Sequence, residues 1–134
     1  MNITAKRVEV ICRQLREASQ GTPRPLTQWL KKDGLFFRPE EAEAAAAPWE
    51  EFDSETRHWY GPDKHYWFRT SFTMPQELAG KPVRLWLATQ LESGDDGRNP
   101  QFLLFVNGRV TQGLDINHRD VPLTEHAKPG EVYQ

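Results

Sequence analysis

The sequence predicts a mainly β fold preceded by one N-terminal helix. In residues 65–75 the apolar side chains fall on one face of an extended chain, at Tyr66, Phe68, Phe72 and Met74. A second segment repeats this period of two with Val83, Leu85, Leu87 and Leu91. Asn107-Gly108 is the strongest short hairpin signal, because both turn positions need positive φ. These patterns indicate antiparallel strands across residues 65–134.

Residues from about Thr4 to Ala18 are expected to form one amphipathic helix, which Ser19-Gln20-Gly21 ends. The apolar side chains of this helix fall at helical spacing, at Val8, Ile11, Cys12 and Leu15. We interpret the stripe as packing against a sheet or a neighbouring domain, in preference to a membrane or a partner protein. Cys12 is interpreted as a small buried hydrophobe, because no His is placed to activate it.

The segment between the helix and the strands is expected to be irregular. Thr22 to Pro39 contains three prolines and no sustained period, although large apolar residues provide anchors. Residues 40–47 favour a short helix, with Pro39 at its start, acidic residues in its first turn and Pro48 as its stop. The chain therefore divides into a helix, an irregular Trp- and Pro-containing lead-in, and sandwich strands, over residues 1–21, 22–64 and 65–134.

The second half of the chain predicts one hairpin and one incomplete strand. Residues 101–106 are apolar on both faces, so the hairpin should join a strand ending at Val106 to one starting at Arg109. Val132-Tyr133-Gln134 resembles the opening of a further strand, which suggests that the chain is a fragment of a larger polypeptide. An unpaired strand edge and exposed apolar surface would then favour self-association into a homo-oligomer.

Composition excludes several partners. The 134 residues are 37% hydrophobic and 27% charged, as in ordinary globular proteins, and a net charge of -2 gives no electrostatic footprint for nucleic acid or an anionic membrane. No segment approaches the roughly 20 apolar residues that span a bilayer. The single cysteine cannot form an intrachain disulfide, and a Cys-poor chain without a signal peptide points to the cytoplasm.

No spacing singles out a catalytic or metal site. The acidic candidates are best interpreted as solvated loop residues, and they are Asp53, Glu92, Asp95, Asp96, Asp115 and Glu125. The four histidines are spread out and match no metal-binding motif. Residues 95–99 contain oxygen ligands that suit calcium but lack the EF-hand spacing, so an ordinary loop is preferred. We assign no catalytic residue and no metal ligand in this chain.

Trp67 and Trp86 lie one position out of phase with the apolar faces of their strands. Both rings should therefore point to the second face of the sandwich. That face either holds a glycan, whose C–H groups stack on aromatic rings, or is covered by the helix and the lead-in. We favour covering, because exposed apolar patches usually become interfaces.

The strands resemble the N-terminal β-domain of family 38 glycoside hydrolases, the α-mannosidases. The matching segments are Trp67-Phe68-Arg69, Met74-Pro75, Gly80-Lys81-Pro82-Val83, Phe105-Val106-Asn107-Gly108, Gln112-Gly113-Leu114-Asp115, Asn117-His118-Arg119 and Lys128-Pro129-Gly130-Glu131. The same order of motifs, with looser matches, occurs in the sugar-binding jelly-roll domains of family 2 glycosidases. The run 113–119 together with an N-terminal helix favours family 38.

The resemblance implies a jelly-roll-like antiparallel β-sandwich of the galactose-binding type. It also implies the non-catalytic N-terminal domain of a cytoplasmic α-mannosidase, whose catalytic Asp and zinc ligands belong to a barrel that follows. No residue here matches those motifs, so this chain alone should be inactive and hold no cofactor. The implied partners are the downstream catalytic domain and mannose-containing glycans. Two alternatives stay open, namely a stand-alone carbohydrate-binding module and a protein-interaction sandwich.

The run 113–119 concentrates hydrogen-bonding side chains and has three candidate uses. Asp and Asn commonly bond their own backbone at turns, which is the preferred interpretation. The same side chains suit sugar hydroxyls, or Arg119 could reach a carboxylate of the barrel in a two-pronged contact. The candidate residues for carbohydrate or interdomain contact are Trp67, Trp86, Asp115, Asn117, His118 and Arg119.

Overall fold

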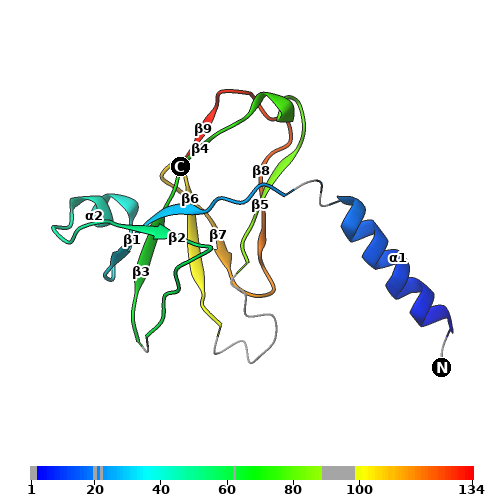
Figure 1. Cartoon of the computed structure of the whole chain (residues 1–134), viewed down its shortest axis with the longest axis horizontal. Helices are drawn as coiled ribbons and strands as arrows, with labels where there is room; N and C mark the ends of the chain where they lie inside the picture. Colours follow the sequence, from blue (N-terminus) through cyan, green and yellow to red (C-terminus); the bar gives the residue numbers. More distant parts are fainter. Residues whose placement is uncertain (1–2, 20, 22, 62, 89–98) are drawn as a thin grey trace.

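A computed structural model describes residues 3–19, 21, 23–61, 63–88 and 99–134. It confirms a mainly β chain with antiparallel pairing and one N-terminal helix (Figure 1). The elements in chain order are α1 (Ile3–Ser19), β1 (Gln28–Asp33), α2 (Pro39–Ala44), β2 (Glu50–Asp53), β3 (Tyr66–Arg69), β4 (Phe72–Thr73), the 3-10 turn η1 (Gln76–Leu78), β5 (Val83–Trp86), β6 (Phe102–Val106), β7 (Arg109–Leu114), β8 (Asp120–Thr124) and β9 (Val132–Tyr133).

The described strands form one larger sheet and three ribbons. The sheet has three strands in the order β2-β1-β3, and the ribbons are β4-β9, β5-β8 and β6-β7. Every pair is antiparallel. The finer expectation of a jelly-roll sandwich stays a prediction.

The structure differs from the irregular lead-in expected over residues 22–64. β1 lies in this segment and is the central strand of the sheet, with β2 on one side and β3 on the other. The sequence of β1 does not predict a central strand, because its buried position is occupied by a lysine, Lys32. The Nζ of Lys32 donates to the carbonyls of Ala42 and Ala45, at 2.6 and 3.1 Å. These bonds offset the cost of burying an ammonium group.

α2 begins at Pro39 as predicted but ends earlier than expected. Its last residue is Ala44, and Ala45 is already extended with φ -67° and ψ 137°. Pro48 disfavours the α conformation for the residue before it, so the alanine run cannot continue as a helix up to Pro48. Two carbonyls near this end, of Ala42 and Ala45, are the ones that Lys32 satisfies.

The predicted hairpin is confirmed. β6 ends at Val106 and β7 begins at Arg109, while Asn107 and Gly108 have φ of 50° and 75°. Both positive values fit a tight turn between twisted antiparallel strands. The turn is also tied to the end of the chain, because Asn107 N–H donates to the Gln134 carbonyl and Gln134 N–H donates to Asn107 Oδ1, both at 2.9 Å.

Two apolar groups hold the strands together. Met74, Ala127 and Tyr133 are buried, and around them pack Phe72, Leu78, Val83, Val106 and Leu123. The rings of Phe72 and Tyr133 stack with centroids 5.3 Å apart, which joins β4 to β9. A second group joins the three-stranded sheet to β6 through tilted and edge-to-face rings, those of Phe52, Trp59, Tyr66, Phe68 and Phe102.

α1 lies apart from the strands (Figure 1). Its stripe residues Val8, Ile11 and Leu15 are exposed, so the expected packing against a sheet is wrong. Cys12 is also exposed, which corrects its interpretation as a buried hydrophobe. The reason is that no described element of the chain covers this helix face. Packing against a neighbouring domain stays a prediction. No helix in the described part of the chain combines the length and apolarity needed to cross a membrane.

Candidate functional site

The β7–β8 loop, residues 115–119, and the end of β5 form the candidate site. Strand register places Trp86 of β5 directly opposite Asp120 of β8. The N–H of Leu87, the residue that follows β5, donates to the Arg119 carbonyl at 2.9 Å. Trp86 and the loop, selected separately from the sequence, therefore lie next to each other.

Asp115 fixes the shape of the loop. Its Oδ1 accepts the backbone N–H groups of Asn117 and His118, at 2.7 and 2.8 Å. The Nδ1 atom of His118 lies 3.0 and 3.1 Å from the two carboxylate oxygens. The backbone bond from Asn117 is the largest cause that lowers the pKa of Asp115, followed by bonds from His118. The predicted local capping by Asp115 is thus observed.

The loop presents His118 outward and turns Arg119 inward. The His118 side chain is 69% exposed. Arg119 uses Nε to donate to the Ile116 carbonyl at 2.6 Å, which anchors it within the loop. A two-pronged contact of Arg119 with a carboxylate, one of the three candidate uses of the loop, would have to use its terminal amino groups alone. Asn117 is exposed at the tip between Asp115 and His118.

The outer face of the β5–β8 ribbon continues this surface. Strand alternation puts Val83, Leu85 and Val121 toward the interior and leaves a mixed polar and aromatic set outside, consisting of Arg84, Trp86, Asp120 and Pro122. Arg84 Nε donates to Asp120 Oδ1 at 2.7 Å, and this bond raises the pKa of Arg84. Trp86 is 53% exposed, so the expectation that the helix and lead-in cover it is wrong. The helix lies elsewhere, and the lead-in joins a different sheet as β1 and β2.

Trp67 does not belong to this site. It lies on β3, is half-buried, and stacks on Phe105 of β6 with centroids 5.6 Å apart and planes at 30°. No ring contact joins it to Trp86 among the described residues. Trp67 therefore fills space between two strands, as a buried tryptophan ordinarily does.

Arg84 and Asp120 are the site residues that the sequence did not single out. A signal for Arg84 was present, because it lies two positions before Trp86 and must share its face in a strand. Asp120 gave no comparable signal, since its position opposite Trp86 depends on the pairing of β5 with β8 and on the register shift between Val83 and Arg84.

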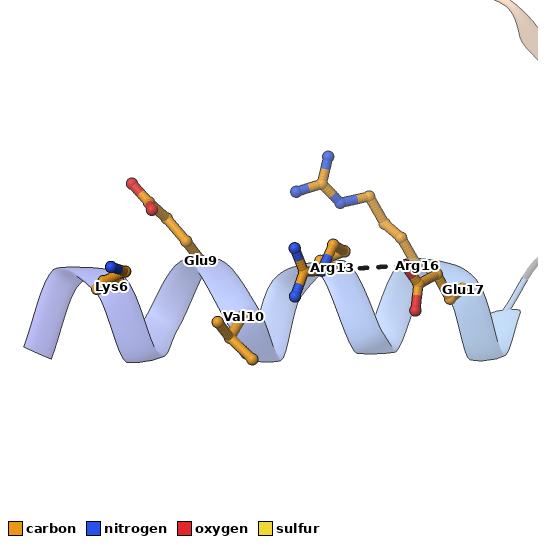
Figure 2. Close-up of a pocket in the computed structure, with 6 residues that line it drawn as sticks. All are labelled: Lys6, Glu9, Val10, Arg13, Arg16 and Glu17. Atoms are coloured by element: carbon orange, nitrogen blue, oxygen red, sulfur yellow. Dashed lines mark ion pairs between the residues drawn. The ribbon is translucent and has the colours of Figure 1, made fainter.

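Other features of the described surface give less evidence of a functional site. A shallow hollow on α1 is lined by side chains of one helix only, with an Arg13–Glu17 ion pair of 3.9 Å (Figure 2). No group of three or more metal-ligating side chains occurs in the described residues. Of the sequence candidates, Leu91, Glu92, Asp95 and Asp96 lie outside the described residues.

Comparison with known proteins identifies no relative of this chain. No family model matches the chain, and neither a curated protein nor a solved structure matches it.

Proposed function

We propose that this chain is a non-catalytic β-domain of a cytoplasmic α-mannosidase and that it supports the catalytic barrel of that enzyme. The proposal rests mainly on the hydrogen-bonded conformation of the β7–β8 loop. Residues 115–119 of the run 113–119, which favoured the resemblance to family 38, form a loop that is held by its own hydrogen bonds and exposes the imidazole of His118. A loop already fixed by its own hydrogen bonds loses little conformational entropy when it binds a partner.

The chemistry of the loop suits contact with another domain. In neutral His118, an Nδ1–H that donates to Asp115 leaves Nε2 as an acceptor for a partner hydroxyl or amide. The proposed partner is the downstream catalytic domain of the same polypeptide. The zinc expected by resemblance belongs to that barrel.

The test compares the chain with the complete polypeptide that contains it. With an aryl α-mannoside and added zinc, the isolated chain should give only background release, and the complete polypeptide should turn over. His118→Ala in the complete polypeptide should lower its thermal stability or its turnover. Tyr60→Ala is the matched control, because Tyr60 is 85% exposed and lies outside the loop.

Two results would contradict the proposal. The first is a complete polypeptide without α-mannosidase activity. The second is turnover by the isolated chain that disappears in Asp115→Asn or Asp53→Asn, since this would place catalysis in the present residues.

A further inference from the structure

We infer that the outer face of the β5–β8 ribbon is a binding platform for a mannose-type pyranose, with Trp86 as the stacking ring and the Arg84–Asp120 pair as the hydroxyl-binding group. This inference rests on the proposed function and deepens it, because it assigns the contact with the glycan to three residues of this domain.

The platform has an aromatic surface, the ring of Trp86. Trp86 is 53% exposed and points away from the interior, so part of its indole face is open to solvent. The ring is held on a paired strand, with its neighbour Leu87 bonded to the Arg119 carbonyl. An indole needs only two side-chain torsions to be fixed, so it provides a large contact area at low entropic cost. The C–H face of a pyranose can stack on such a ring.

A pair of opposite charges, Arg84 and Asp120, lies beside that ring. Asp120 is directly across the ladder from Trp86, where opposed Cβ atoms are about 4.5–5.5 Å apart. Arg84 donates to Asp120 through Nε, and both side chains are about half exposed. Among the described residues this leaves the terminal amino groups of Arg84 and the second oxygen of Asp120 without a recorded partner.

The charged pair and the ring together suit a sugar ligand. Adjacent sugar hydroxyls each donate and accept, so they need a donor and an acceptor held side by side. Arg84 and Asp120 provide both in a fixed pair, and charged groups form the stronger hydrogen bonds. A stable protein interface would instead need about 800 Å² per partner with an apolar, charge-poor core. One ring flanked by an ion pair fits a small polar ring better.

The position of the platform agrees with the proposed domain contact. Asp120 directly follows Arg119, the last residue of the β7–β8 loop. A pyranose on Trp86 would therefore lie beside the loop that is proposed to contact the catalytic domain.

The experiment titrates the ¹⁵N-labelled chain with methyl α-D-mannopyranoside and follows two sets of resonances by NMR: the tryptophan indole N–H groups, and the backbone amides of β5 and β8. The backbone amides report binding in the variants that lack Trp86. We expect the Trp86 resonance, assigned from Trp86→Tyr, to shift with a Kd on the order of 1 mM. Trp86→Ala should weaken binding about tenfold, equivalent to about 1.4 kcal/mol. Trp86→Tyr should keep most of the affinity because it retains an aromatic face, and Asp120→Asn should weaken binding several-fold.

Tyr60→Ala is the control, because it removes a more exposed aromatic ring, and no ion pair that includes Tyr60 or its neighbours Trp59 and Gly61 is recorded among the described residues. Retained backbone spectra in each variant separate lost binding from lost folding. The platform is overturned if the Trp86 resonance does not move at about 10 mM sugar, or if Trp86→Ala binds as well as the wild type. It is also overturned if joining the catalytic domain closes Trp86 to sugar. A mannosidase assay of the complete polypeptide fails or succeeds independently of this titration, so the two proposals can be told apart.

Discussion

The ammonium group of Lys32 lies 4.8 Å from the centre of the Trp49 ring, on a strand position where Lys32 is only 2% exposed. A second cation, Arg69 of β3, lies 4.7 Å from the same ring and pairs with Glu43 of α2. Cations over an indole face are attracted by its quadrupole, and more strongly where water is excluded. The Trp49 ring therefore contacts a cation from β1 and a cation from β3, and each of these cations also bonds to a residue of α2.

Lys32→Met should destabilise the chain by about 1.5–3 kcal/mol, the range for hydrogen bonds to a charged group. The substitution keeps the apolar stem but removes the donor from the Ala42 and Ala45 carbonyls. Urea unfolding followed by circular dichroism measures the loss. Lys81→Met is the control: Lys81 is exposed, and no side-chain hydrogen bond of Lys81 is recorded among the described residues, so its loss should stay below about 0.5 kcal/mol. Equal losses in the two variants would contradict the role given to Lys32.

Gly108→Val should lower the free energy of unfolding by about 1–3 kcal/mol, because a β-branched residue is strained at φ 75°. An added Cβ would meet no atom within 4 Å, so the cost is one of backbone conformation. Gly113→Val is the control, since Gly113 also has open space but lies on β7 without a positive φ. It should change stability by less than about 0.5 kcal/mol. Unchanged thermal stability in Gly108→Val would argue against the turn.

Asp115 should titrate below the usual range of an aspartate, as measured by carboxyl-carbon NMR against pH. Its pKa is lowered in the folded chain, so its contribution to stability is present above the unfolded pKa and is lost as pH falls through the folded one. Because the backbone N–H of Asn117 is the largest cause, His118→Gln should leave most of the depression in place. A return of the Asp115 pKa to its usual value in His118→Gln would show that the imidazole, and not the backbone, dominates.

The isolated chain should self-associate through the exposed stripe of α1, since apolar side chains there are uncovered by the described strands. Ile11→Lys should raise the concentration at which dimers form. Gln14→Lys adds the same charge to the same helix without removing an apolar side chain, so it should have a smaller effect. Light scattering over a concentration series gives the result. A wild-type chain that stays monomeric at the highest concentrations would contradict this prediction.

The candidate site was only partly predictable. Trp86 and the run 113–119 were recognisable because an out-of-phase aromatic and a cluster of polar side chains are local patterns. Their closeness was not, because it follows from the pairing of β5 with β8, two strands separated by the β6–β7 hairpin. The covering of Trp86 was predicted wrongly for the same reason, since no local pattern says which segment packs over which face.

The sequence by itself determined the local structure of part of this protein, but not of residues 22–64, where β1 and β2 lie. Alternation, helical spacing and Asn107-Gly108 identify α1, β3, β5 and the β6–β7 hairpin, since each depends on residues close together in the chain. Only the tertiary structure decided the place of β1, whose Lys32 is buried because the distant carbonyls of Ala42 and Ala45 accept hydrogen bonds from its ammonium group. It likewise decided that α1 is exposed and that Trp86 is opposite Asp120. Burial and pairing depend on partners far along the chain, which a local pattern does not contain.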